Sequence, residues 1–218
     1  MYLIIAGLSG IGKNLAELLV KEGNAVVIVD SDEERCTEMA TSSDVMVITG
    51  DATKKSVLEE AGVKRADALV ALTNDDSDNL MICMTGREMG AKKVISLVND
   101  AVHVETFKEA GIDFQVKPHA VVAKHIYRMI LQPYVKDFLS FERAEIFAIE
   151  VEEGMKCVDK KVCEVGTPNG VKILVLERAG KYLDKDANIE PKDWLTLIVD
   201  RESTKRGVDF MNRWFTKG

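Results

Sequence analysis

The sequence predicts an α/β protein with two parts: a Rossmann-like, doubly wound parallel sheet over residues 1–131 and a small α+β domain over residues 144–218. Two observations carry this prediction. Short β-branched runs alternate with helix-period segments along the first part, and a glycine-rich loop stands between the first run and the first helix. After residue 144, strand-like runs are separated by turn residues, which is typical of a small mixed domain.

Six apolar runs predict the strands of the parallel sheet. They are largely continuous runs without in-out alternation, which is typical of parallel strands covered by helices on both faces. The runs are residues 2–6, 25–29, 45–49, 68–72, 94–98 and 114–116. Between the first two, the apolar residues fall at i, i+4, i+7 and i+8: Ile11, Leu15, Leu18 and Leu19. This spacing predicts an amphipathic helix, which Gly23 ends.

A longer apolar helix is expected to begin at Pro118 and to end before Gln132-Pro133. Because it is apolar nearly all round, it must be covered on most sides. Residues 134–141 then carry an aromatic stripe, and we expect residues 132–143 to form a crossover linker or helix. Two interpretations stay open: ordinary packing within the chain, and packing of residues 119–141 against another subunit.

The second part predicts three strands, at residues 145–151, 171–176 and 194–199, and a closing helix over residues 203–215. At about 75 residues it is small for a stable core, so dimerisation through it would stabilise it.

Composition excludes several classes of protein. The chain has 29 Lys and Arg against 36 Asp and Glu, a net charge of −7, and 46% hydrophobic residues, which indicates a globular protein. Its longest stretch without a charged residue is residues 1–12, shorter than the roughly 18 apolar residues of a membrane helix. No signal-peptide pattern opens the sequence, so we expect a cytoplasmic location. The interspersed, net acidic charges disfavour nucleic acid as a partner.

The cysteines and histidines predict neither disulfides nor a metal site. No C-x-x-C pair and no metal-ligand spacing occurs among Cys36, Cys83, Cys157, Cys163, His103, His119 and His125.

The most informative segment is Gly7-Leu8-Ser9-Gly10-Ile11-Gly12, between a predicted strand and a predicted helix. Gly7 and Gly12 match the first and third glycines of a dinucleotide-binding loop, which form a tight turn and allow close packing of helix on strand. The helix amides after such a loop hold phosphates. Ser9 occupies the middle glycine position, where its Cβ would crowd a pyrophosphate or its hydroxyl would hydrogen-bond to it.

Asp30 supports the interpretation of the loop. It ends the second run 18 residues after Gly12, close to where an acidic residue binds the ribose hydroxyls of a dinucleotide. A carboxylate there repels a 2′-phosphate, so NADP is disfavoured. The alternative is a Rossmann-like domain without a nucleotide, in which Asp30 only caps the following helix.

Two more polar segments follow strands at the same edge of the sheet: Gly50-Asp51-Ala52-Thr53 and residues 73–79. Their shared edge favours a ligand. The alternative is a plain turn and helix cap in each, with Thr53 or Asp76 as the N-cap.

No catalytic apparatus accompanies these segments. The sequence has no Tyr-x-x-x-Lys pair, and its second part has no histidine to move a proton during hydride transfer. Arg178, Lys181 and Lys185 are interpreted as solvated charges of a hairpin. A nucleotide site without such groups indicates a sensor and not an enzyme. The alternative is an NAD-dependent dehydrogenase with a small C-terminal substrate domain.

Short motifs occur in order along nearly the whole chain. Besides the glycine loop they are Val29-Asp30, Gly50-Asp51-Ala52-Thr53, Leu72-Thr73-Asn74-Asp75-Asp76 with Asn79, Gly111-Ile112-Asp113, Val116-Lys117-Pro118 and Glu190-Pro191-Lys192-Asp193-Trp194-Leu195. In these motifs the chain resembles the regulator of potassium conductance (RCK) family, the Trk- and Ktr-type cytoplasmic subunits of potassium uptake systems.

The resemblance implies a nucleotide-sensing regulatory subunit that gates a membrane potassium transporter or channel from the cytoplasmic face. It also implies a homodimer formed through the crossover at residues 119–141, assembled into a tetrameric or octameric ring.

The resemblance places a pyrophosphate on the glycine loop, a ribose on Asp30, adenine near Asp51, and the distal half of the ligand near Thr73. The nucleotide-binding residues expected in full are Gly7, Ser9, Gly10, Ile11, Gly12, Asp30, Ser31, Asp51, Ala52, Thr73 and Asn74.

The chain departs from the family pattern at Ser9, at Gly10, where many relatives have an arginine, and at Leu97, where many have a basic residue. Basic groups at those two positions would help to hold a terminal phosphate, so their absence weakens the case for ATP. Lys13 is the remaining basic residue that would replace them. We therefore expect NAD(H) first, with ADP, AMP or ATP as alternatives.

Overall fold

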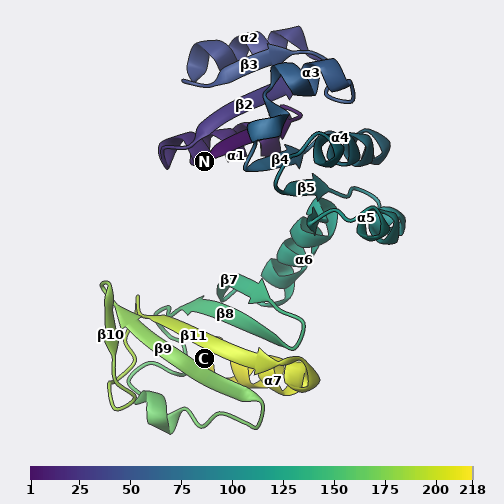
Figure 1. Cartoon of the computed structure of the whole chain (residues 1–218). Coiled ribbons are helices and arrows are strands. Elements are labelled where there is room, and N and C mark those ends of the chain that lie inside the picture. The colour runs from purple at the N-terminus through teal and green to yellow at the C-terminus, as the bar shows by residue number, and fades with distance from the viewer. Residues whose placement is uncertain (218) are drawn as a thin grey trace. The chain divides into compact units, whose positions relative to one another are not determined.

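The computed structural model describes residues 1–217, which divide into two compact units, the first being Met1–Val121 and the second beginning at Val122. Figure 1 shows a parallel sheet in purple to teal in the first unit and an antiparallel sheet in green to yellow in the second. Each unit is described by itself.

The first unit is built on a six-stranded parallel sheet in the order β3-β2-β1-β4-β5-β6. All six predicted strands are confirmed. Their bounds are β1 (Tyr2–Ala6), β2 (Ala25–Asp30), β3 (Met46–Thr49), β4 (Ala68–Ala71), β5 (Val94–Leu97) and β6 (Phe114–Val116).

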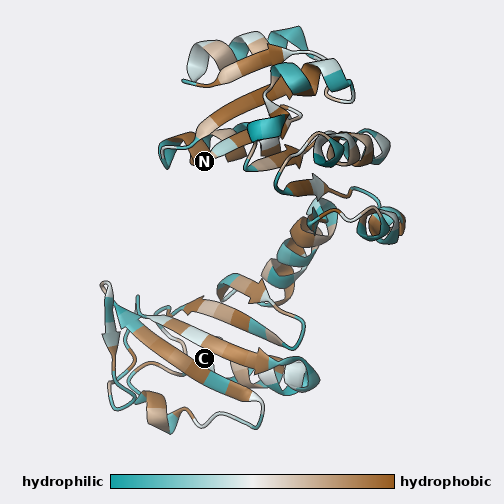
Figure 2. Cartoon of the chain, viewed as in Figure 1, coloured by the Kyte–Doolittle hydropathy of each residue, from teal (hydrophilic) through white to brown (hydrophobic). Residues whose placement is uncertain are grey.

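Helices cover both faces of this sheet, as a doubly wound fold requires. They are α1 (Gly10–Lys21), α2 (Glu33–Ser42), α3 (Lys55–Glu60), α4 (Asp76–Glu88) and α5 (Val104–Glu109). Ala16 of α1 and Met39 of α2 belong to one core, and Leu58, Ile82 and Phe107 of the other three helices belong to the second. Figure 2 shows the brown, apolar strands between these layers.

The strand order places a crevice at the carboxyl ends of β1 and β4. From β1 the chain builds outward through β2 and β3, and it then returns to place β4 on the other side of β1. In open α/β sheets ligands bind at such a reversal, because the loops after the two neighbouring strands lead away from each other.

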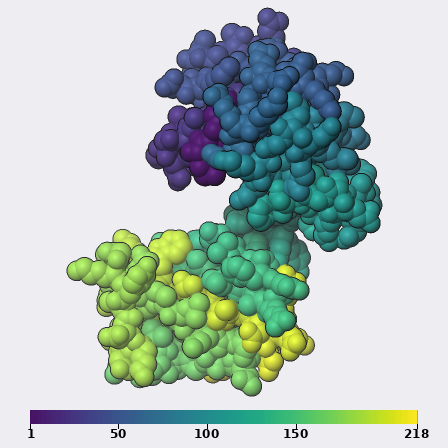
Figure 3. Space-filling model, viewed as in Figure 1, coloured from purple at the N-terminus to yellow at the C-terminus, as the bar shows by residue number. Residues whose placement is uncertain are grey.

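The second unit is built on a five-stranded antiparallel sheet in the order β10-β9-β11-β8-β7, with one helix. The three predicted strands and the closing helix are confirmed. The elements are β7 (Val135–Ser140), β8 (Ala144–Glu150), β9 (Val171–Arg178), β10 (Lys181–Leu183), β11 (Trp194–Asp200) and α7 (Thr204–Trp214). In Figure 3 yellow residues from the end of the chain lie among green residues from its middle, as this strand order requires.

Short 3₁₀ helices complete both units. They are η1 (Val63–Arg65), η2 (Ala101–His103), η3 (Val162–Glu164) and η4 (Arg201–Ser203).

The segment after Gln132-Pro133 is not a helix, so that part of the expectation for residues 132–143 is wrong. Residues 135–140 form β7, which pairs with β8. Phe138 packs on Phe147 of β8, with ring centroids 6.4 Å apart. The apolar spacing fits a helix because an irregularity between Val135 and Asp137 interrupts the two-residue period of the strand.

Arg178 is not a solvated hairpin charge, although the exposed Lys181 and Lys185 are. Its guanidinium Nε and one terminal nitrogen bind the fully buried Asp193 carboxylate at 2.7 and 2.9 Å, and its other nitrogen binds Glu190 at 2.7 Å. The bonds to Asp193 raise the pKa of Arg178, despite the opposite effect of burial. The pair fixes β9 to the turn before β11.

Along the chain, α6 (Pro118–Leu131) follows β6 and precedes β7, and it begins at the predicted proline. None of its residues is buried in the single chain, although nine of its 14 residues are apolar, and Figure 2 shows brown bands along it. The exposed large apolar residues of α6 are Val121, Val122, Ile126, Tyr127, Met129, Ile130 and Leu131. Across residues 1–217, no helix has both the length and the apolar character needed to cross a membrane.

Candidate nucleotide-binding site

A cleft of about 370 Å³ opens where the carboxyl ends of β1, β2, β3 and β4 meet. The structure brings eight of the predicted site residues together around it. They are Gly7, Ser9, Asp30, Ser31, Asp51, Ala52, Thr73 and Asn74. Of the three that do not line it, Gly10 borders a smaller adjoining hollow of about 140 Å³, and Ile11 and Gly12 lie in the first turn of α1.

Gly7 and Gly12 must be glycines because neighbouring backbone atoms leave no room for a Cβ at either position. Gly7 has φ of +107°, and a Cβ there would lie 2.8 Å from the carbonyl carbon of Leu72. A Cβ on Gly12 would lie 2.1 Å from the carbonyl oxygen of Gly7. Gly12 therefore serves the packing of α1 on the loop and does not face the cleft.

Ser9 stands at the N-cap position of α1 but does not cap it through its side chain. Its hydroxyl instead lies 3.4 Å from the carbonyl oxygen of Leu72, across the loop. The first amides of α1 have no acceptor within the helix, as at any helix start, and helix starts of this kind suit anions in general.

Asp30 is buried, with 8% of its surface exposed, and it does not cap α2. Its two carboxylate oxygens accept hydrogen bonds from the backbone N–H of Leu8 and, at 2.9 Å, from that of Asp32. The N-cap of α2 is Asp32, which accepts from the N–H of Arg35. In the alternative of a domain without a nucleotide, the expectation that Asp30 caps the following helix is therefore wrong.

The segment after β3 is ordered by Asp51. Its carboxylate accepts hydrogen bonds from the N–H and the hydroxyl of Thr53, at 2.9 and 2.6 Å, and these bonds lower the pKa of Asp51. Neither helix cap predicted at this edge is correct. The N-cap of α3 is Lys54 and not Thr53, and the N-cap of α4 is Asp75 and not Asp76.

The segment after β4 is held by Asn79, whose side chain is completely buried. Its carbonyl oxygen accepts from the N–H and hydroxyl of Thr73, at 2.9 and 2.8 Å, and its NH₂ donates to the carbonyl oxygen of Thr73 at 3.0 Å. The position of Thr73 at the cleft is thus fixed from inside the protein.

Residues 3–118, more than half of the chain, match the TrkA-N domain family. The chain belongs to the TrkA-N domain family. Among curated relatives it is 32% identical over 212 residues to a Trk system potassium uptake protein TrkA homolog of Methanothermobacter thermautotrophicus, covering 95% of this chain and 98% of the relative. It is 31% identical over 223 residues to the TrkA protein of Halomonas elongata, covering 99% of this chain but only 48% of that protein.

Solved structures with the same fold include the GsuK channel, with a TM-score of 0.70 and 20% identity. The match covers all of this chain and 40% of the GsuK chain. The GsuK channel bound to NAD has a TM-score of 0.66, 19% identity and the same two coverages. At these identities the likeness shows the fold.

The charges around the cleft of this TrkA-N domain are mostly negative. Asp30, Asp51 and Asp78 line it, against the single cation Arg35. Arg35 is itself paired, with Asp30 at 3.3 Å and Asp32 at 3.0 Å. Carboxylates suit ribose hydroxyls and an adenine amino group better than they suit a further phosphate.

Lys13, which was expected to replace the missing phosphate-binding cations, is paired with an acidic residue. Its ammonium binds the Glu38 carboxylate at 2.8 Å, and this hydrogen bond raises the pKa of Lys13. Lys13 and Glu38 border the small hollow beside Gly10. The lysine next to the glycine loop of the TrkA-N domain is therefore engaged in an exposed ion pair.

Sequence reasoning missed Arg35 and Asp78 as cleft residues and did not assign a role to Asn79. Arg35 lies one helical turn after the N-cap of α2, so its spacing from Asp30 is a local signal. Asn79 carried no such signal, because its partners lie on a loop six residues earlier and at the end of β5.

Proposed function

We propose that this chain is a nucleotide-sensing regulatory subunit of a potassium transporter or channel. The observation that carries the proposal is the cleft at the β1–β4 reversal, where buried Asp30 joins the glycine loop to the end of β2. Curated relatives that match this chain over nearly its whole length are named as potassium uptake proteins, which supplies the physiological context.

The proposed ligand is NAD(H), followed by ADP, AMP or ATP, with NADP disfavoured. The amides of residues 7–12 would hold a pyrophosphate, Asp30 and Ser31 a ribose, Asp51 and Ala52 the adenine, and Thr73 and Asn74 the distal half. The negative lining of the cleft supports a ligand without a 2′-phosphate. Structures of the same fold are described as bound to NAD, ADP and AMP.

The proposed assembly is a homodimer formed through residues 119–141 that builds a tetrameric or octameric ring. It would lie in the cytoplasm against the membrane protein that it regulates. The uncovered apolar side chains of α6 support this, because an isolated helix loses stabilisation when such a face stays in water.

The mechanism would be a shift between conformations of the ring. A nucleotide changes the equilibrium only if it binds one conformation more tightly than the other. The chain would then act without chemistry, as a binding protein and not as an enzyme. Steady NADH turnover on a small substrate would instead favour the dehydrogenase alternative.

The test is potassium uptake in cells that lack the chain. The wild-type chain should restore nucleotide-dependent uptake, and Asp30→Ala should be produced at the same level without restoring that dependence. Full restoration by Asp30→Ala would contradict the proposal.

A further inference from the structure

A continuous polar network extends from Thr73, at the cleft, to the surface at His103. Asn99 donates through its side-chain NH₂ to the carbonyl oxygen of Thr73 at 3.3 Å and to Asp76 at 3.0 Å. The N–H of Asn99 also donates to Asp76, at 2.7 Å. The loop after β5 is thereby tied to the loop after β4 through one side chain.

Asp76 is the centre of this network and is 9% exposed. One of its carboxylate oxygens takes both bonds from Asn99, and the other accepts from the N–H of Asp100 at 2.9 Å and lies 2.8 Å from Nδ1 of His103. Burial alone raises the pKa of Asp76, but these donors outweigh it and lower the pKa. All four positions around the carboxylate are occupied by groups of a single loop, residues 99–103.

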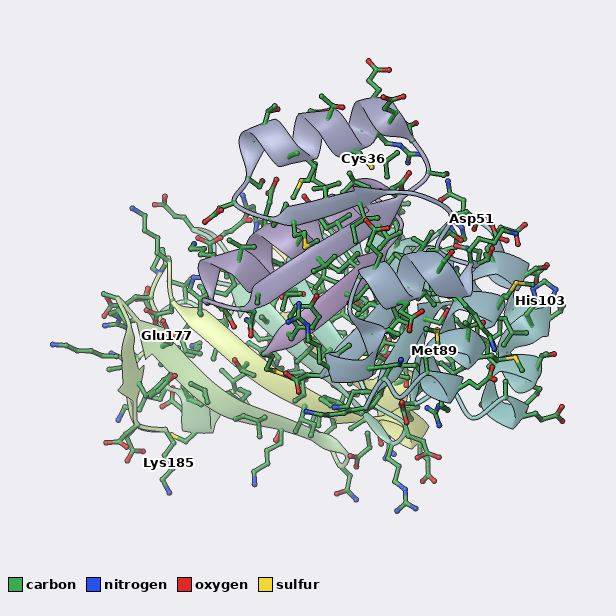
Figure 4. The ribbon with its side chains drawn as sticks, turned by 45° about the horizontal axis from the view of Figure 1, so that its top comes forward. Cys36, Asp51, Met89, His103, Glu177 and Lys185 are labelled. Atoms are coloured by element: carbon green, nitrogen blue, oxygen red, sulfur yellow. The ribbon has the colours of Figure 1, made fainter. Side chains whose placement is uncertain are left out.

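His103 is the exposed end of the network and closes η2. The charged groups that act on it are Asp75 and Asp76 from the start of α4 and Asp100 from its own loop. Figure 4 shows His103 and the cleft residue Asp51 on the same side of the first unit. Three carboxylates beside one imidazole favour its protonated form.

We propose that Asp76 is a positioning residue for the nucleotide site, holding Asn99 against Thr73, and that protonation of His103 tightens this hold. The proposal rests on the proposed function, because it concerns the same cleft. Asp76 does not line the cleft itself. Its effect on a nucleotide passes through Thr73.

The direction of the pH dependence follows from the contacts. The hydrogen bond to Asp76 raises the pKa of His103. Below that pKa the imidazolium holds Asp76 and the loop at residues 99–103, and above it the attraction is lost. Nucleotide affinity should therefore fall as the pH rises through the His103 pKa, and by linkage a bound nucleotide should raise that pKa.

The positioning role is tested first without a nucleotide, by hydrogen exchange at the side-chain NH₂ of Asn99, which donates to both Thr73 and Asp76. Asp76→Asn should speed exchange there at least tenfold, because the amide side chain cannot accept all four bonds. Asp113→Asn is the matched control: Asp113 also accepts a backbone N–H and pairs with an arginine, but before β6, away from the cleft. Equal exchange at the Asn99 side chain in wild type and Asp76→Asn would overturn the proposal.

The link to the nucleotide is tested by calorimetric titration with NAD, whose pyrophosphate does not titrate near neutral pH. Wild-type affinity should fall several-fold between about pH 5.5 and about pH 9, and His103→Gln should bind equally across that range. The same pH profile in both proteins would overturn the proposal. If wild type binds no nucleotide at any pH, the proposed function is contradicted, and the exchange comparison alone decides the role of Asp76.

Discussion

Asp30 is the residue on which the candidate site depends most. Its carboxylate binds the backbone of the glycine loop through Leu8, the β2–α2 turn through Asp32, and the guanidinium of Arg35. It therefore shapes the cleft, and under the proposed function its oxygens would also bind a ribose. The sequence spacing predicted its place but not its bond to Leu8, because that bond joins residues 22 apart.

Replacing Asp30 by alanine should weaken nucleotide binding by about 2 kcal/mol, roughly thirtyfold, because a charged hydrogen-bond acceptor is lost. Isothermal titration measures the change. Asp67→Ala is the matched control, since Asp67 accepts from the N–H of Tyr2 at the opposite end of β1. An Asp30→Ala protein with unchanged affinity would remove Asp30 from the site.

Glu145 carries the main acid-sensitive contact of the second unit. It is buried on β8 and binds Lys124 and Arg128 of α6. Burial alone raises the pKa of Glu145, but the two cations outweigh it and lower the pKa. The stabilisation is therefore present above the unfolded pKa, about 4.3, and is lost as the pH falls through the lower folded value.

Glu145→Gln should reduce the stability of the second unit by about 3 kcal/mol at neutral pH, because it leaves two cations partly buried without their carboxylate. Urea unfolding at pH 7 and at about pH 3 measures this, and the difference between variant and wild type should shrink at the lower pH. A difference that stays constant would show that the ion pairs add nothing.

Residue-scale prediction succeeded where the signal is local and failed where the partner is distant. Gly7 and Asp30 belong to a short pattern with a known backbone requirement. Arg178 was misread because its partner, Asp193, lies 15 residues later, directly before the neighbouring strand β11. Asn79 was left without a role because neither its complete burial nor its bonds to Thr73 can be read from the sequence.

At the scale of elements, the parallel sheet was predictable and β7 was not. Parallel strands are typically continuous apolar runs, so all six could be recognised without knowing their neighbours, although the edge strands β3 and β6 are largely exposed. Strand β7 is an edge strand with an irregular register, and its side chains alternate only in part. Pairing with β8 overrides a local pattern that is equally compatible with a helix.

The exposed apolar side of α6 gives a prediction about association. Ile130 is 72% exposed in the single chain, so Ile130→Glu should leave each chain folded. In an interface formed by α6 the new carboxylate would be buried without a partner, which opposes assembly. Light scattering should show a smaller particle, with unchanged circular dichroism. Phe138 is unsuited to this test, because it packs on Phe147 inside the second unit. An unchanged mass would exclude α6 from the interface.

At the scale of the whole molecule, each unit has cores of its own: two in the first, on opposite faces of its sheet, and one in the second. Because every residue of the cleft belongs to the first unit, a nucleotide should stabilise that unit and not the second. Calorimetric unfolding should show two transitions, of which NAD raises only one. A single transition that moves as a whole would mean that the units unfold together.

The central claim is that the cleft at the β1–β4 reversal binds a nucleotide without a 2′-phosphate. The most direct measurement is a thermal-shift panel with NAD, NADH, NADP, ATP, ADP and AMP. A ligand at 100 times its dissociation constant stabilises by about 2.7 kcal/mol, which is several degrees for a domain of this size. We expect a clear shift with NAD or NADH and a smaller one with NADP, whereas no shift with any of the six would contradict the claim.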